Sequence, residues 1–209
     1  MAKNEEKDQK DATRRKILDV ARRIFALHGF EGASVDAIVR ASGLSKGALY
    51  WHFPGKLELY LEIMREETMS IMERFRIPKE DGKRVDPVEF LVERGGALID
   101  DLYRDPETRM LWMDLTIVAQ RGDSRSRALA AEIIDSVLDS LLPEIGDAVT
   151  ERSPETRSMD SRDRLLCLTH VFDGFVINLG LSLRPDVAKR YWETMVRMLL
   201  DERCNHETR

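Results

Sequence analysis

Residues 34–56 read SVDAIVRASGLSKGALYWHFPGK, and this stretch decides how the N-terminal part of the chain folds. Ser34 and Ser45 each precede a short run with helical spacing of apolar residues, and serine is a favoured N-cap residue. Gly43 stands between the two runs, where glycine supplies the turn conformation that follows a helix. The stretch therefore predicts two short helices joined by a tight turn, which is a helix-turn-helix over residues 34–53.

Helical patterns continue on both sides of this motif. Upstream, apolar residues recur at helical spacing from Thr13, a suitable N-cap, until Gly29 ends the run. Downstream, strand signals are nearly absent, and helical patterns cover residues 56–76, 86–103, 106–120, 124–142, 161–183 and 186–202. The sequence therefore predicts an all-α fold with a three-helix N-terminal domain, a C-terminal helical domain and about nine helices in total.

The charge of the chain is unevenly distributed. The 209 residues carry a net charge of −5, and 43% of them are hydrophobic, which is enough for a real core. Residues 1–56 hold eleven Lys and Arg against seven Asp and Glu, a balance of +4, so the remainder carries −9. This asymmetry predicts a basic module attached to an acidic body. The negative net charge of the whole chain therefore does not argue against a nucleic-acid partner for the basic module.

Several other classes of protein are disfavoured by the sequence. The cysteines, Cys167 and Cys204, fit neither a disulfide framework nor a zinc cluster, which favours a reducing compartment. The first ten residues lack the apolar run of a secretory signal, so we expect a cytoplasmic protein. Residues 165–183 approach the length of a membrane span, but Asp173 interrupts them, which favours a buried helix.

Catalytic signatures are also missing from the sequence. There is no glycine-rich phosphate loop and no nucleophile elbow. The four histidines are scattered, and no pair has the helical spacing of metal ligands. We therefore expect no enzyme, no catalytic residues, no cofactor and no metal.

The residues around the motif identify a known family. Residues 34–56, preceded by Ala21, Phe25 and Gly29-Phe30 and followed by Leu57-Glu58-Leu59-Tyr60, resemble the DNA-binding domain of TetR-family transcriptional regulators. The resemblance is dense over residues 11–64. It implies a DNA-binding domain over residues 11–71 and a helical effector-binding and dimerisation domain over residues 72–209. We expect residues 1–10 to be a disordered tail.

The resemblance also implies which residues contact DNA. In TetR-family members the second helix of the motif, here residues 45–52, lies in the major groove. Lys46 and Gly47 would meet the backbone and base edges, Tyr50 would help to hold phosphates, and Lys56 is similar to a lysine that contacts a phosphate. The full expected set is Ser34, Val35, Ser45, Lys46, Gly47, Ala48, Tyr50, Trp51, His52 and Lys56. The alternative is that the lysines are ordinary solvated side chains and the aromatic residues belong to the core.

Residue roles in the acidic body are less specific. A large apolar lining with a few polar groups is typical of a ligand site, and the candidates are Tyr103, Met110, Trp112, Met113, Thr116, Ile117, His170, Phe172, Asp173, Phe175 and Asn178. Dimerisation through the last two long helices, which the family implies, would use Leu165, Leu168, Val176, Leu179, Leu183, Tyr191, Met195, Met198 and Leu199. For both sets the alternative is that these residues pack in the hydrophobic core of the single chain.

These features predict a homodimeric, sequence-specific transcriptional regulator, acting as a repressor that a small, largely apolar effector releases from a palindromic operator. The alternative is a structural, nucleoid-type DNA-binding protein without a ligand. A further rival is an enzyme or small-molecule carrier with a vestigial DNA-binding domain. No membrane partner is expected.

Overall fold

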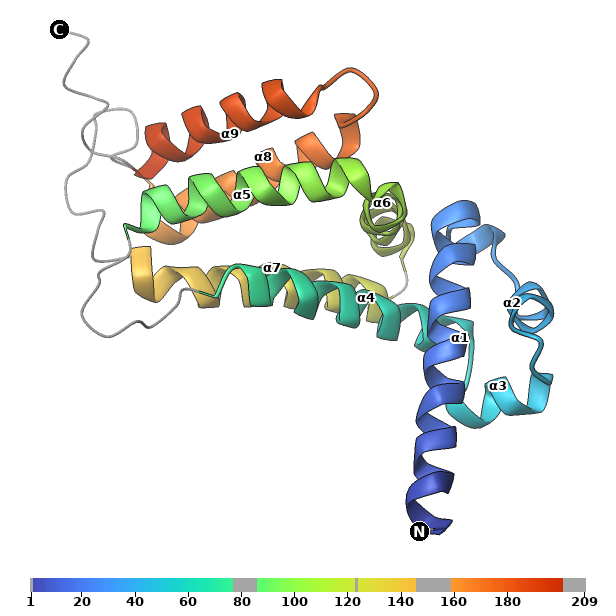
Figure 1. Cartoon of the computed structure of the whole chain (residues 1–209). Coiled ribbons are helices and arrows are strands. Elements are labelled where there is room, and N and C mark those ends of the chain that lie inside the picture. Colours follow the sequence, from blue (N-terminus) through green and yellow to red (C-terminus); the bar gives the residue numbers. More distant parts are fainter. Residues whose placement is uncertain (1, 77–85, 123, 146–158, 201–209) are drawn as a thin grey trace, which may run out of the picture. The chain divides into compact units, whose positions relative to one another are not determined.

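The computed structural model describes residues 2–76, 86–122, 124–145 and 159–200 (Figure 1). The helices of this described part are α1 (Ala2–Gly32), α2 (Val35–Ser42), α3 (Lys46–His52), α4 (Lys56–Arg74), α5 (Pro87–Arg104), α6 (Pro106–Arg121), α7 (Ser124–Ile145), α8 (Ser161–Asn178) and α9 (Pro185–Leu200). An isolated bridge between Leu179 and Leu183 is the only β-type pairing within those ranges. The all-α prediction is confirmed.

The chain forms two compact units, which are described separately. Unit 1 consists of Met1–Thr68 and Met110–Leu129, and unit 2 consists of Met69–Arg109 and Ala130–Arg209. The sequence placed the domain boundary after residue 71, inside the helix expected over residues 56–76. The division after Thr68 also falls inside α4, close to the expected position, but unit 1 takes in addition a segment from α6 and α7.

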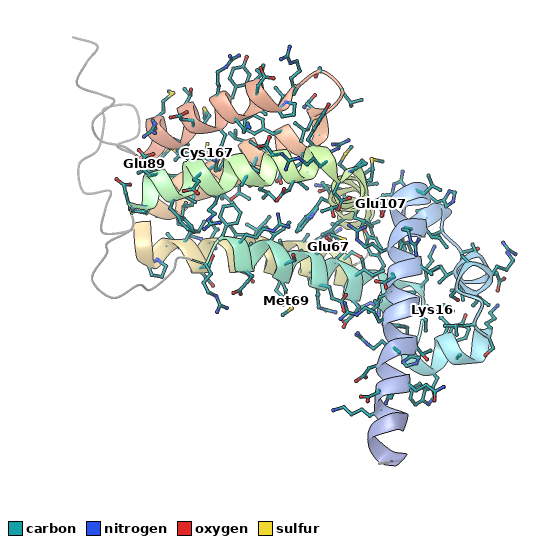
Figure 2. The ribbon with its side chains drawn as sticks, in the orientation of Figure 1. Lys16, Glu67, Met69, Glu89, Glu107 and Cys167 are labelled. Atoms are coloured by element: carbon teal, nitrogen blue, oxygen red, sulfur yellow. The ribbon has the colours of Figure 1, made fainter. Side chains whose placement is uncertain are left out.

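Unit 1 has an apolar core to which four consecutive helices contribute. Helix α1 packs against α2, and α2 packs against α3. Residues without solvent exposure come from each of them and from α4, and they include Ile17, Ala21, Phe25, Ile38, Leu49, Leu59, Tyr60 and Met64. At the edge of this core, Arg22 Nε of α1 donates to Glu67 Oε1 of α4 over 2.6 Å; Glu67 is labelled in Figure 2. The buried residues support the short helix-turn-helix, which has few core residues of its own.

The first helix is longer than expected. Residues 2–10, which belong to the segment expected to be a disordered tail, are helical and form the first turns of α1. The regular helix is broken at Gly29, where φ is +67° and ψ is 172°. This break lets the Phe30 N–H leave the helical ladder and donate to Asp114 Oδ2 over 2.9 Å. A Cβ at Gly29 would lie 2.9 Å from Asp114 Oδ1, so both the backbone and the contact favour glycine there.

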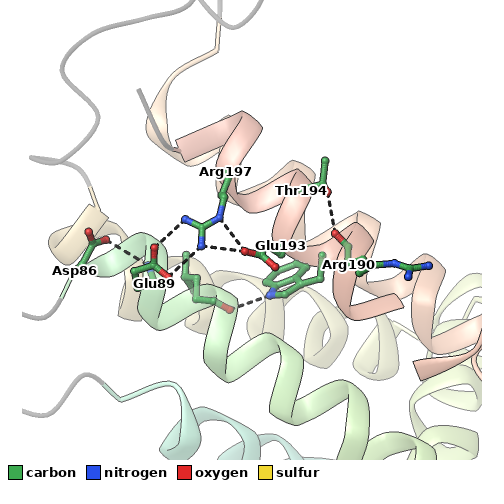
Figure 3. Close-up of polar contacts among 8 residues, drawn as sticks. Asp86, Glu89, Arg190, Glu193, Thr194 and Arg197 are labelled. Carbon is green, nitrogen blue, oxygen red and sulfur yellow. Dashed lines mark hydrogen bonds and ion pairs between the residues drawn. The ribbon is translucent and has the colours of Figure 1, made fainter. Parts of the chain in front are cut away.

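In unit 2, α5 packs most extensively against α9. Trp192 of α9 is buried, and its Nε1 donates to the Leu91 carbonyl of α5 over 2.8 Å. At the rim, Arg197 of α9 lies between Glu89 of α5 and Glu193 of its own helix, with N···O distances of 2.8 to 3.1 Å (Figure 3). Hydrogen bonds to Glu89 and then to Glu193 raise the pKa of the Arg197 guanidinium above its usual value. The two helices are thus joined by an apolar core and a charged edge.

Helix α8 ends earlier than the periodicity predicts. The pattern indicated a helix over residues 161–183, but α8 stops at Asn178. The Asn178 carbonyl accepts hydrogen bonds from the N–H groups of Leu181, Ser182 and Leu183, and Gly180 has a φ of +81°. A tight turn therefore replaces the last helical residues. Within the described ranges, no helix combines the length and the apolar character that crossing a membrane requires.

Candidate nucleic-acid interface

The helix-turn-helix is closed by local caps at both of its helices. Ser34 Oγ accepts the Ala37 N–H over 3.1 Å at the start of α2, and Ser45 Oγ accepts the Ala48 N–H over 3.1 Å at the start of α3. Gly43 has a φ of +66°, and its N–H returns to carbonyls in the last turn of α2. The predicted caps and turn are confirmed. Each serine cap of this kind contributes about 1 kcal/mol to stability.

Helix α3 has one anchoring residue and a broad outward face. Leu49 is fully buried. Lys46, Gly47, Tyr50 and Trp51 are exposed, with exposed fractions of 45% for Tyr50 and 64% for Trp51. Large exposed aromatic side chains on a short, capped helix are not needed by the core. Together with the Lys46 ammonium, their hydroxyl and indole N–H groups give this face donors of the kind that contact phosphates and base edges.

Lys46 has a carboxylate partner in the structure. Its Nζ lies 2.9 Å from Asp36 Oδ1 of α2, and both side chains are exposed. The hydrogen bond between them lowers the pKa of Asp36 and raises that of Lys46. Because an exposed ion pair contributes little net free energy, Lys46 can exchange this partner for another anion.

His52 lies on the inner edge of α3, beside α1. Its ring meets Trp51 edge-on, with centroids 4.6 Å apart. Burial, followed by the positive charges of Lys10 and Arg14, lowers the pKa of His52 from its usual value. The imidazole is therefore neutral at pH 7 and offers one N–H donor rather than a positive charge.

Lys56 makes contacts inside unit 1 that the sequence did not suggest. Its Nζ donates to the Phe30 carbonyl over 2.7 Å and to the Ala33 carbonyl over 3.1 Å. The same ammonium lies 4.3 Å from the centroid of the Phe30 ring. Lys56 therefore ties the start of α4 to the end of α1. Its expected phosphate contact stays a prediction, because these carbonyls already take two of its donors.

The ten expected DNA-contacting residues all belong to one continuous part of unit 1. Ser34, Ser45, Lys46, Gly47, Tyr50 and Trp51 are exposed, whereas Val35, Ala48, His52 and Lys56 are half-buried. The sequence analysis missed the contribution of α1 to this surface. Lys10 Nζ lies 4.4 Å from the Trp51 ring centroid, and Arg14 Cζ lies 5.3 Å from that of Phe53. The spacing of Lys7, Lys10 and Arg14 on one helical face was the available signal.

The candidate effector residues are divided between the two units. Met110, Trp112, Met113, Thr116 and Ile117 lie in unit 1, and Tyr103, His170, Phe172, Asp173, Phe175 and Asn178 lie in unit 2. Most of them are exposed on helix surfaces. Phe172 packs edge-on against the buried Trp192, with centroids 5.3 Å apart, as a core residue would. Neither unit by itself gathers the whole set into one site.

Many of the candidate dimer residues are core residues of the single chain. Leu165, Leu168, Val176, Leu179 and Leu199 are at most 9% exposed within unit 2. Because these five side chains are buried within the single chain, they offer little surface to a second copy. Leu183 and Met195 are half-buried, whereas Tyr191 and Met198 are exposed. Ile177, which is not in the expected set, is 49% exposed on α8.

Comparison with known proteins agrees with this geometry. The family described as "Bacterial regulatory proteins, tetR family" matches residues 17–63, which include the helix-turn-helix. The chain is 39% identical over 111 residues to the HTH-type transcriptional repressor AcnR of Corynebacterium efficiens, covering 49% of this chain and 57% of the relative. For AcnR of Corynebacterium glutamicum the identity is 34% over 116 residues, covering 51% of this chain and 60% of the relative. The chain thus spans little more than half of these relatives.

The likeness to solved structures extends further along the chain. Salmonella enterica GusR has a TM-score of 0.73 and 26% identity, and the match covers 90% of this chain and 95% of that one. A transcriptional regulator from Rhodococcus sp. Rha1, at 20% identity, shares the fold with a TM-score of 0.69 over 90% of this chain and 95% of its own. The AcnR relatives are named as transcriptional repressors, in agreement with the expectation that the chain is not an enzyme. The helix-turn-helix domain that residues 17–63 form thus belongs to the tetR family of bacterial regulatory proteins.

Proposed function

We propose that this protein is a sequence-specific DNA-binding transcriptional regulator that represses transcription from a palindromic operator. The observation that carries the proposal is the outward face of α3, where Lys46, Gly47, Tyr50 and Trp51 are exposed on a helix capped at its first residue. Leu49 is fully buried and anchors this helix in the core of unit 1. A rigidly held helix with exposed donors is suited to the major groove of DNA.

Each side chain of this face has a distinct proposed role. Gly47 has no side chain, which lets the α3 backbone approach the groove closely. Tyr50 and Trp51 donate their O–H and N–H groups to phosphate oxygens, which sets the position of the helix. Lys46 exchanges Asp36 for a phosphate or a base edge. Because few side chains can read bases directly, part of the specificity comes from the shape of the DNA.

The site assignment is tested on DNA selected from a random pool by the wild-type protein. A Lys46→Ala/Tyr50→Ala variant is expected to bind the selected duplex about 100-fold more weakly, since each lost contact costs about 1–3 kcal/mol. Fluorescence anisotropy at fixed salt measures the affinity. The control, Tyr103→Ala/Arg104→Ala, removes one exposed tyrosine and one exposed cation from unit 2 and is expected to bind as the wild type does.

Two outcomes would contradict the proposal. Full affinity in the Lys46→Ala/Tyr50→Ala variant would exclude this face as the DNA-binding surface. Recovery of many unrelated sequences from the pool would favour the nucleoid-type alternative. Repeating the selection with small, largely apolar compounds tests the release by an effector, which stays a prediction from the family resemblance.

We further propose that two chains pair through the exposed faces of α8 and α9. Ile177, Tyr191 and Met198 are each about half exposed although they are large and apolar. Gly174 lies on the same side of α8 as Ile177, and a Cβ there would meet nothing within 4 Å, so a helix of a second copy can approach closely. Two identical DNA-binding units on a two-fold axis match a palindromic operator.

The pairing predicts that an Ile177→Glu/Met198→Glu variant is monomeric at concentrations where the wild type is dimeric. Buried carboxylates without partners oppose association strongly. Sedimentation velocity measures the oligomeric state, and circular dichroism checks that the helices are retained. The control is Leu27→Glu/Met69→Glu, which alters two apolar residues of α1 and α4 that are even more exposed, at 76% and 71%, and is expected to leave the dimer intact. A dimeric Ile177→Glu/Met198→Glu variant would refute this interface.

A further inference from the structure

The first turns of α1 carry a row of cations that lies outside the residues matched to the family. Lys7, Lys10 and Arg14 are spaced by three and four residues, so they share one face of the helix. The same face continues through Ile17 to Ala21, both of which are buried in unit 1. The inner face of α1 therefore changes from apolar to basic where the core ends.

This basic row lies against the motif rather than away from it. Lys10 Nζ lies 4.4 Å from the ring centroid of Trp51, which is 64% exposed on the outward face of α3. An ammonium over an exposed indole gains a modest cation–π attraction, and it keeps most of its hydration. A DNA strand that touches Trp51 would therefore lie within reach of Lys10.

The charges around the row differ from one residue to the next. Arg14 forms ion pairs with Glu62 and Glu66 of α4, so its charge is largely balanced. Asp11 lies on α1 beside the row, and its negative charge acts in the opposite direction to Lys10 and Arg14 on the pKa of His52 in α3. Among the residues whose side chains the structure describes, which begin at residue 7, no carboxylate lies within ion-pair distance of Lys7 or Lys10. These two ammonium groups are thus available for an external anion.

We propose that Lys7 and Lys10 bind DNA phosphates beside the groove that α3 enters, so that the N-terminal turns of α1 are part of the DNA-binding surface. This inference rests on the proposed DNA-binding function. The helix holds the two cations one turn apart, which suits successive phosphates of one strand. Each neutralised phosphate releases condensed counterions, and this release makes the contact visible as a salt dependence.

The test compares the salt dependence of affinity in two variants of the full chain. In Lys7→Ala/Lys10→Ala, the slope of log affinity against log salt concentration is expected to become shallower by about 0.9 for each lost phosphate contact, or about two for each chain. The matched control is Arg15→Ala/Lys16→Ala, which removes two exposed charges from the opposite side of the same helix and leaves the slope unchanged; Lys16 is labelled on α1 in Figure 2. Lys7→Arg/Lys10→Arg is expected to keep the wild-type slope.

Other outcomes separate this inference from the function on which it rests. Equal slopes in the two alanine variants would overturn the inference while leaving DNA binding by α3 intact. A weaker affinity with an unchanged slope would also overturn it, because Lys10 would then act only by supporting Trp51. If the wild-type protein bound no DNA in the same assay, the proposed function itself would fail.

Discussion

Gly47→Glu is expected to abolish specific DNA binding while leaving the fold intact. Gly47 is exposed on the outward face of α3, and a Cβ there meets only Ser45 Oγ, at 3.8 Å. The fold therefore has room for the new side chain, and glutamate favours a helix more than glycine does, by up to about 1 kcal/mol. In the proposed DNA complex the glutamate side chain would project between α3 and the walls of the major groove, where it would prevent the close approach of the helix. It would also face the phosphates, where like charges cost several kcal/mol.

The expected loss of affinity for Gly47→Glu is about 100-fold or more, with a melting temperature equal to or above that of the wild type. Anisotropy titration and thermal unfolding measure the two quantities on the same preparation. Gly47→Gln is the matched control, because it has the same size without the charge, and it is expected to bind with an intermediate affinity. Wild-type affinity in Gly47→Glu would show that α3 does not enter the groove through this residue.

Gly95→Ala is expected to lower the free energy of unfolding by about 2–4 kcal/mol. A Cβ at Gly95 would lie 2.0 Å from Trp192 Nε1 and 2.3 Å from its Cε2, which is closer than atoms can approach. Trp192 cannot move away freely, because its Nε1 is hydrogen-bonded to the Leu91 carbonyl and its ring packs against Phe172. The substitution must therefore separate α5 from α9 or break that buried hydrogen bond, whose loss costs about 1–3 kcal/mol.

The neighbouring glycine supplies the control for Gly95→Ala. A Cβ at Gly96 would meet Lys189 Cδ at 3.6 Å and Cγ at 3.8 Å, which are ordinary contacts. Gly96→Ala is therefore expected to stabilise the protein by about 0.5–1 kcal/mol through its helix propensity. Urea-induced unfolding monitored by circular dichroism compares the two variants. Equal stabilities for them would contradict the assigned packing of Trp192 on α5.

Local features of the DNA-binding surface could be read from the sequence because they depend on neighbours in the chain. Ser34, Gly43 and Ser45 act on backbone groups three or four residues away, so their types and spacing are enough to predict caps and a turn. The DNA-contacting roles on α3 came from the family resemblance, and the alternative that Tyr50 and Trp51 belong to the core was decided by the structure, in which both are exposed. The helical nature of residues 2–10 was missed, since a polar, charged segment has no apolar stripe that indicates a helix.

Contacts between distant segments could not be read in this way. Lys56 and Lys46 are both lysines in one motif, yet Lys56 donates to carbonyls at the end of α1, whereas Lys46 pairs with an exposed carboxylate. The apolar stripe of α8 is equally compatible with a core and with a dimer interface. Leu165 and Leu168 are buried by the chain's own helices, whereas Ile177 faces outward.

The sequence by itself determined the all-α fold, the caps and turn of the helix-turn-helix and the family to which the N-terminal domain belongs. These properties follow from periodicity and from interactions within about four residues. Both depend only on residues that are close together in the sequence, so they can be read from it directly. The tertiary structure alone decided which lysine is held inside unit 1, which apolar face stays exposed, and that Lys10 lies beside Trp51. Those properties depend on which segments meet in space, and the same side chain is buried or exposed according to the surface that packs against it.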